Sequence, residues 1–220
     1  MTQPKNPQFI SRREVLTGAL AATAVGASSV AQENEAKKGQ FKWQNGNSPW
    51  PLCLDTATIR PQTLEDKISI AAKAGFDAIE PWDGELRDYE NNGGNLKELG
   101  RRIRDAGLFV PSVIGIWNAI PPTTEEWESG LSGIRERMRM ASDVGAKHIQ
   151  VIPQPSRPWQ EFDLAWASAR YRDILVMGLE DYQLNPAVVF VEFLPGAARM
   201  GQAAAIALDE INDEIITNKK

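Results

Sequence analysis

From about residue 50 onward, short apolar runs alternate with longer stretches in which apolar residues recur at helical spacing. The expected strands are 52–55, 76–82, 108–117, 147–152 and 187–194, and the expected helices are 63–74, 95–106, 124–144, 160–184 and 199–208. Strict alternation of strands and helices predicts a parallel sheet. The strands are apolar along most of their length, which is typical of strands covered on both faces.

Similar tripeptides close three of the expected helices, namely Lys-Ala-Gly at 73–75, Asp-Ala-Gly at 105–107 and Asp-Val-Gly at 143–145. Each glycine comes just before a strand, and glycine readily adopts the left-handed conformation found at helix ends. Thr63 and Thr124 are expected to cap two helix starts, because carboxylates follow both threonines. The glycines are 32 and 38 residues apart, which is about the length of one βα unit.

Two architectures fit this alternation: a doubly wound open sheet and a (β/α)8 barrel. A Gly-x-Gly-x-x-Gly segment does not follow any expected strand, so a dinucleotide-binding fold has no motif to support it. Periodicity alone does not separate the two architectures. A complete barrel usually takes about 250 residues, whereas this chain has 220.

The N-terminal residues follow the order of a secretory signal, which is basic, then apolar, then small. Arg12 and Arg13 precede a mildly apolar run at 15–25, and small residues follow at 29–31. A transmembrane anchor is the alternative interpretation. The run is rich in Ala, Gly and Thr, however, and is shorter than the ~20 strongly apolar residues of a membrane span.

The start of this segment, Ser-Arg-Arg-x-x-Leu, is similar to a twin-arginine signal, with Val15 where Phe is usual. We therefore expect residues 1–31 to be a cleaved signal peptide and the polar residues 32–49 to be a linker. The mature protein is then expected in the periplasm, or otherwise outside the cytoplasm, of a bacterium, without a stable membrane span.

The composition, with 42% hydrophobic and 24% charged residues, is that of an ordinary globular domain. The net charge is −5, and Lys and Arg do not cluster beyond short helical runs, which argues against nucleic acid as a partner. The single cysteine, Cys53, excludes an internal disulfide and is expected as a small buried hydrophobe. The single histidine, His148, begins the fourth strand and would lie at the bottom of a barrel, so a catalytic Ser–His or Cys–His pair is not supported.

Four segments carry a family resemblance: Ala-Gly-Phe-Asp-Ala-Ile-Glu at 74–80, Asp-Ala-Gly-Leu at 105–108, Asp-Val-Gly-Ala-Lys-His-Ile at 143–149 and Val-Phe-Val-Glu-Phe at 189–193. In their order and spacing they resemble the sugar phosphate isomerase/epimerase family, whose fold is a xylose-isomerase-like TIM barrel. The resemblance covers roughly residues 50–208. It implies an α/β fold in which about five βα units of a (β/α)8 TIM barrel are present, hence a partial barrel.

The resemblance also implies a chemistry for the carboxyl end of the fifth strand. The family binds one divalent metal, such as Mn, Mg, Zn or Co, through a Glu on strand five and an Asp, a His and a Glu on later strands. Two of its glutamates move a proton between adjacent carbons of a ketose or aldose, while the metal polarises the substrate oxygens. Glu192 matches the first metal ligand and one of the two acid/base groups. The alternative is a strand-end Glu paired with a neighbouring Arg or Lys.

Four further residues follow the ends of expected strands, where barrel enzymes carry their sites. Glu80 ends the second strand, where the family often has an acidic residue in a supporting role. Trp82, Trp117 and Gln154 follow strands two, three and four, and their positions suit the lining of a sugar pocket. Packing in the core or at the rim fits each of them equally well.

Residues 209–220 are charged and are expected as a tail, and strands six to eight with their metal ligands have no counterpart in the sequence. One Glu cannot hold a catalytic divalent cation. Three interpretations follow: a truncated isomerase that is weak or inactive alone, a protomer that completes its sheet with another chain, and a non-catalytic exported sugar-binding or structural module. We favour the first, with a small sugar or a sugar-like molecule as the expected substrate.

Overall fold

The computed structural model describes residues 42–152, 163–189 and 197–218. The chain divides into two compact units, Met1–Trp50 and Pro51–Lys220. In the first unit, the described residues form a tight turn around the short helix η1 (Gln44–Gly46), closed by a bridge between Trp43 and Ser48. The export signal expected in residues 1–31 lies outside the described residues and stays a prediction.

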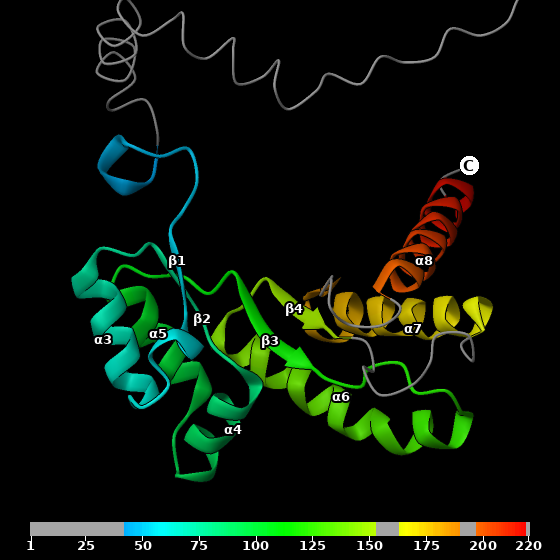
Figure 1. Cartoon of the computed structure of the whole chain (residues 1–220), viewed down its shortest axis with the longest axis horizontal. Coiled ribbons are helices and arrows are strands. Elements are labelled where there is room, and N and C mark those ends of the chain that lie inside the picture. Colours follow the sequence, from blue (N-terminus) through cyan, green and yellow to red (C-terminus); the bar gives the residue numbers. More distant parts are fainter. Residues whose placement is uncertain (1–41, 153–162, 190–196, 219–220) are drawn as a thin grey trace, which may run out of the picture. The chain divides into compact units, whose positions relative to one another are not determined.

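The second unit alternates strands and helices along the chain (Figure 1). Its elements are β1 (Cys53–Asp55), η2 (Thr56–Ile59), α3 (Leu64–Ala74), β2 (Ala78–Glu80), α4 (Asp83–Asn91), α5 (Leu96–Asp105), β3 (Ser112–Ile116), α6 (Thr124–Val144), β4 (His148–Val151), α7 (Leu164–Tyr182), β5 (Asn185–Val188) and α8 (Ala197–Asn218). The five βα units predicted from the sequence are confirmed. Among the described residues, no helix combines the length and the apolar character that crossing a membrane requires.

Three elements differ from the expectation. Helix α4 was not predicted, because its nine residues are mostly polar and only Leu86 and Asp83 are buried. Helix α7 begins at Leu164, after the expected start at residue 160. Helix α8 continues to Asn218, so the charged segment from residue 209 onward is helical for most of its length instead of ending the fold.

The strands form a parallel series in which each strand lies beside the next along the chain. Strand β1 pairs with β2, and β3 pairs with β4, which pairs with β5. Parallel bridges from Ala78 to Phe109 and from Trp82 to Ile114 join β2 to β3. A doubly wound sheet reverses its strand order at a switch point, whereas a barrel keeps the order of the chain. The series from β1 to β5 therefore matches a partial barrel and excludes a doubly wound sheet.

Glycines end the helices at the predicted places. Gly75, Gly107 and Gly145 have φ values of 82°, 81° and 88°, which are in the left-handed region. The Thr63 side chain caps α3 by accepting from the Asp66 N–H, as expected. The cap of α6 is Thr123 instead of Thr124, because α6 begins at Thr124, one residue earlier than a Thr124 cap would require.

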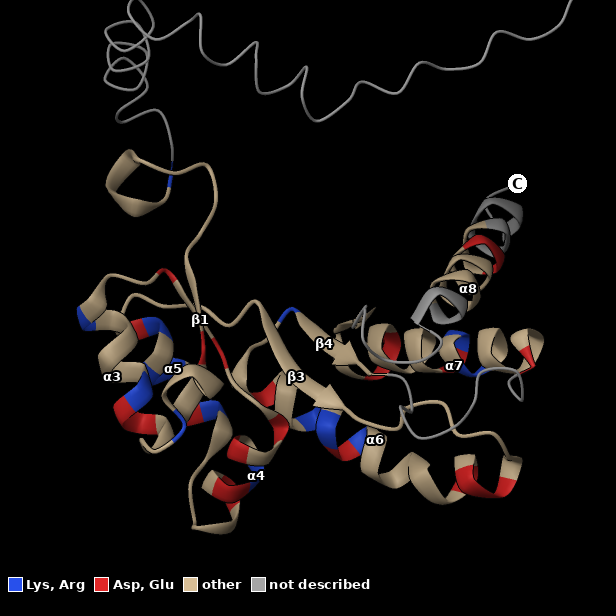
Figure 2. Ribbon diagram, viewed as in Figure 1, with Lys and Arg blue, Asp and Glu red and all other residues tan. Residues whose placement is uncertain are grey.

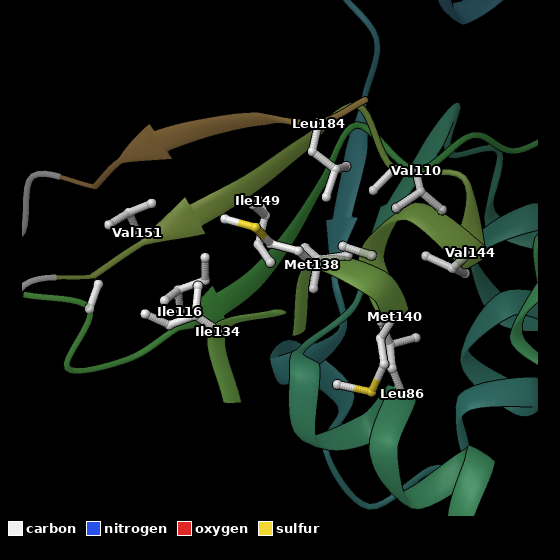
Figure 3. Packing of buried hydrophobic residues seen from close by; sticks show 14 of the residues in the cluster. Leu86, Val110, Ile116, Ile134, Met138, Met140, Val144, Ile149, Val151 and Leu184 are labelled. Atoms are coloured by element: carbon white, nitrogen blue, oxygen red, sulfur yellow. The ribbon is translucent and has the colours of Figure 1, made fainter. Parts of the chain in front are cut away.

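The hydrophobic core lies on the helix side of the sheet. Leu54, Ile79, Val113 and Ile149, one from each of four strands, are at most 8% exposed and belong to one cluster with residues of α3, α5 and α6. Figure 3 shows Met138 of α6 close to Ile149, and Leu86 of α4 beside Met140 of α6. Because side chains alternate along a strand, the residues between these apolar ones face the other side, which is the inner face of the partial barrel.

The helix-end glycines allow a stability test that separates backbone conformation from space. A Cβ built on Gly107 or on Gly130 of α6 meets no atom within 4 Å, but only Gly107 has a positive φ. We expect Gly107→Ala to lower the free energy of unfolding by about 1 kcal/mol, because alanine is strained there. Gly130→Ala should instead raise it by about 0.5–1 kcal/mol. Urea unfolding of the full chain measures the free energy of unfolding of both variants. Equal effects would contradict the left-handed conformation assigned to Gly107.

Candidate functional site

Carboxylates and an amide gather on the inner face at the carboxyl ends of the first strands. Asp55 and Glu80 are partners in the register of β1 and β2 and therefore lie on the same face. The Nε2 of Gln150 on β4 donates to Oε1 of Glu80 at 2.8 Å. Strand β3 lies between β2 and β4, so this hydrogen bond crosses the inner face above it. Layers built from alternate strands are the arrangement inside a TIM barrel.

Glu80 is a half-buried carboxylate with an altered acidity. Burial raises its pKa above the ordinary value, and the charge of Asp55 acts in the same direction. The hydrogen bond from Gln150 to the carboxylate acts against this and lowers the pKa. The net shift is upward, which brings the group closer to the range in which a general acid or base works at neutral pH.

Trp82 is fixed by three neighbours beyond the end of β2. Its Nε1 donates to Oδ1 of Asp55 at 2.9 Å. Its ring stacks with that of Trp117 at a centroid distance of 5.6 Å and an interplanar angle of 28°, and the Arg60 guanidinium lies 5.3 Å from the ring centroid. Trp117 remains 39% exposed. Trp82 is therefore held in place by its neighbours, while part of the Trp117 ring remains exposed.

The Glu85 carboxylate holds the segments behind this site together. Lys67 Nζ of α3 donates to Oε1 at 2.5 Å. The Thr56 hydroxyl of η2 and the backbone N–H of Trp82 donate to Oε2, at 2.5 Å and 2.9 Å. The Lys67 side chain is 4% exposed and that of Glu85 is 23% exposed. One carboxylate thus links the element after β1, the first helix and the start of α4.

Ion pairs attach α4 to α6. Acidic residues lie along α4, and basic residues occupy the middle of α6, whose N-terminal end is acidic (Figure 2). Arg137 Nε donates to Oδ2 of the buried Asp83 at 2.9 Å, and Arg139 Nη2 donates to Glu90 at 2.6 Å. Because Asp83 directly follows Trp82, the first of these pairs also restrains the aromatic stack.

The structure places some of the predicted site residues together and does not describe others. The structure brings Glu80, Trp82 and Trp117 to the same end of the sheet, around Asp55 and Gln150. Gln154 and Glu192 lie outside the described residues, so their roles stay predictions. Sequence reasoning missed Asp55, although it ends a strand as Glu80 does and carries the same signal.

His148 lies where its position predicts, whereas Cys53, which was expected to be buried, is only partly buried. Burial, together with the charges of Glu80 and Asp55, raises the pKa of Cys53 to about 12. Its thiol therefore stays protonated at neutral pH, which does not suit a nucleophile. His148 begins β4, is exposed, and its Nδ1 lies 3.0 Å from the Pro111 carbonyl oxygen, so it lies away from the carboxyl ends of the strands.

The described residues do not fit a divalent metal. Among them, no three His, Cys, Asp or Glu side chains come together in a group that could hold an ion. Oδ1 of Asp55 accepts from the Ala57 N–H and from Trp82 Nε1, and Oε1 of Glu80 accepts from Gln150. Hard cations need several oxygen ligands that are free to coordinate, and these two oxygens are already engaged.

The order of the strands defines a partial TIM barrel, and polar residues gather at the carboxyl ends of its first strands. A family model described as a xylose isomerase-like TIM barrel matches residues 68–201, more than half of the chain. The chain belongs to the xylose isomerase-like TIM barrel family. A comparison with curated proteins finds no match.

Solved structures share this fold at low sequence identity. The IOLI protein with a bound zinc atom has a TM-score of 0.63 and 14% identity over 72% of this chain and 59% of its own. A probable 3-DHS dehydratase, AsbF from Bacillus anthracis, has a TM-score of 0.58, 15% identity and the same two coverages. D-psicose 3-epimerase has a TM-score of 0.53 and 16% identity over 70% of this chain and 60% of its own. The chain thus spans less than two thirds of each of these proteins.

The raised pKa of Glu80 predicts a stability change with pH. Below the ordinary Glu pKa of about 4.3, the side chain is protonated in both the folded and the unfolded chain and burial carries no charge penalty. As the pH rises through the folded-state pKa, the charge becomes buried and destabilises the fold. We expect Glu80→Gln to gain stability relative to the wild type between pH 4 and pH 7. Urea unfolding across this range measures it, and a gain that shrinks as the pH rises would contradict the raised pKa.

Proposed function

We propose that the mouth around Glu80, Gln150 and Trp117 binds a small sugar or sugar-like polyol, and that its chemistry is isomerase- or epimerase-like proton transfer. The observation that carries this proposal is Glu80, a half-buried carboxylate with a raised pKa, oriented by Gln150 on the inner face. A carboxylate of this kind is suited to take a proton from a carbon next to a carbonyl group and to return it. The hydrogen bond from Gln150 holds one oxygen of the Glu80 carboxylate in place.

Trp117 supplies the second element that a sugar site needs. Its ring stacks on Trp82 and remains 39% exposed. The face of an indole ring is electron-rich and attracts the slightly positive C–H groups of a sugar ring. The Trp82 ring, which is fixed by Asp55, packs against one face of Trp117. This contact already restricts the Trp117 side chain, so less conformational entropy is lost when a ligand binds.

The second carboxylate that proton transfer requires is proposed to be Glu192, on the family resemblance alone. A divalent metal, once bound, would polarise the carbonyl and hydroxyl oxygens of the substrate. The described residues do not form a metal site, so the proposal uses no step through a metal. The solved relatives include an epimerase crystallised in the presence of D-fructose and a protein with bound zinc. The epimerase supports sugar chemistry in the proposal, and the zinc-bound protein supports a metal in the family.

A sugar-binding module without catalysis is the second candidate. It is favoured by one observation: Asp55 and Glu80 are engaged by protein donors, and a second free carboxylate does not face Glu80 among the described residues. The two candidates share the mouth and differ in whether a carbon-bound proton exchanges with solvent.

Binding and exchange can be measured on the same full-length protein. We expect tryptophan fluorescence to detect ketose or aldose binding, and Trp117→Ala to weaken it about tenfold through the lost ring contact. Trp117→Phe should retain most of the affinity. In D2O, proton NMR should show deuterium entering the carbon beside the sugar carbonyl, and Glu80→Gln should abolish this exchange, whereas the exposed control Glu128→Gln should not.

Three outcomes separate the candidates. Exchange that depends on Glu80 supports the isomerase-like function. Binding that depends on Trp117 without any exchange leaves the binding module. Absence of binding across ketoses and aldoses overturns both candidates.

A further inference from the structure

A second concave feature adjoins the mouth. A pocket of about 280 Å³ lies between the segment that follows β3 and the N-terminal half of α6. Trp117, which belongs to the aromatic stack of the mouth, also lines this pocket, together with Asn118, Trp127, Gly130 and Arg137. The pocket therefore begins at the residue where the proposed sugar site ends. Its volume is close to the lower end of ordinary small-molecule sites.

Two tryptophans, Trp117 and Trp127, line the pocket beside polar residues, and part of its wall is held by the core. Trp127 is 4% exposed and Ile134 is 5% exposed, so both are held by the core. A Cβ built on Gly130 meets no atom within 4 Å, so the glycine leaves room on this side of α6. A glycine in a helix interior costs about 1 kcal/mol relative to alanine, and packing within the described residues does not account for this one.

Two polar groups in the pocket are available to a ligand. Arg137 donates through Nε to Asp83 and through Nη1 to the Gly133 carbonyl, which leaves Nη2 without a partner in the described part of the chain. The side-chain amide of Asn118 likewise has no hydrogen-bond partner among the described residues, and Asn118 has a φ of 52°. Arg137 and Asn118 thus offer directed donors, and Asn118 also offers an acceptor.

We propose that this pocket is a saccharide subsite that takes a second sugar ring when the first ring lies against Glu80 and the exposed face of Trp117. The inference rests on the proposed function, because Trp117 joins the two places. An aromatic surface with a few fixed donors and acceptors matches the alternating C–H and hydroxyl groups of a sugar ring. The substrate class is therefore a reducing disaccharide instead of a single free sugar, because its free anomeric carbon still supplies the carbonyl group that proton transfer at Glu80 requires.

The charges of the pocket favour a neutral ring over an anion. Arg137 is already paired with Asp83, and the carboxylate of Glu126 also lines the pocket. An isolated phosphate or carboxylate would have to compete with Asp83 for the guanidinium and would face the second carboxylate. Neutral hydroxyl groups can bond to both the cationic and the anionic groups without this conflict.

A pair of matched α6 variants tests the subsite in the full chain. Gly130→Leu fills the pocket from its open side, and Ser132→Leu adds the same side chain at an exposed position of α6 that does not line the pocket. Asn118→Gly removes the amide while accepting the positive φ. Binding is measured by calorimetry with glucose, cellobiose and maltose, and thermal unfolding checks that each variant is folded.

We expect at least one disaccharide to bind about tenfold or more tightly than glucose, a gain of about 1.4 kcal/mol. Gly130→Leu should remove this gain and leave glucose binding unchanged, Asn118→Gly should reduce the gain, and Ser132→Leu should keep it. Glucose binding without a disaccharide gain, or a gain that persists in both Gly130→Leu and Asn118→Gly, overturns the subsite but leaves the proposed function standing. Absence of binding by all three sugars overturns the subsite, whereas the proposed function is judged separately by the ketose and aldose measurements.

Discussion

The ion pair between Lys67 and Glu85 is the interaction on which the architecture of the mouth depends. Lys67 is almost completely buried, and its charge has no other partner of opposite sign among the described residues. Glu85 also accepts from Thr56 and from the Trp82 N–H. Removing one partner of such a pair leaves a buried charge, which typically costs about 3–5 kcal/mol. The contacts of Glu85 therefore fix α3 and the segments after β1 and β2 relative to one another.

The consequences of this pair extend to the residues that are proposed to bind a ligand. Glu85 fixes the backbone at Trp82, and the Trp82 ring then bonds to Asp55 and stacks with Trp117. From the other side, Arg137 of α6 holds Asp83, the residue after Trp82. The position of Trp117 therefore depends on contacts that lead back to two buried or partly buried ion pairs, Lys67–Glu85 and Arg137–Asp83. Such a prepared surface binds a ligand with less loss of conformational freedom.

Local signals made much of the fold predictable. Gly75, Gly107 and Gly145 mark helix ends because few other residues adopt a positive φ, and this constraint acts within a few residues of sequence. Helix α4 escaped prediction because tertiary ion pairs, such as that between Asp83 and Arg137, stabilise it in place of an apolar stripe. The choice of barrel over open sheet needed the order of the strands, which periodicity does not contain.

The site was predictable only where a strand end was apparent in the sequence. Glu80, Trp82 and Trp117 follow apolar runs, so their placement at the mouth could be inferred. The bond from Gln150 to Glu80 spans 70 residues, and the Lys67–Glu85 pair spans 18. Both depend on which side chains the folded sheet and helices bring together. A Lys in the middle of a helix gives no local sign that it will be buried.

A double-mutant cycle on Lys67 and Glu85 tests this central role most directly. We predict that Lys67→Met lowers the free energy of unfolding by about 3 kcal/mol or more, because it leaves Glu85 without its counter-charge. The double variant with Glu85→Gln should be more stable than the sum of the single effects by about 1 kcal/mol or more. The NMR signal of the Trp82 indole N–H should shift in each single variant. Strictly additive energies with an unchanged Trp82 signal would contradict the central role of the pair.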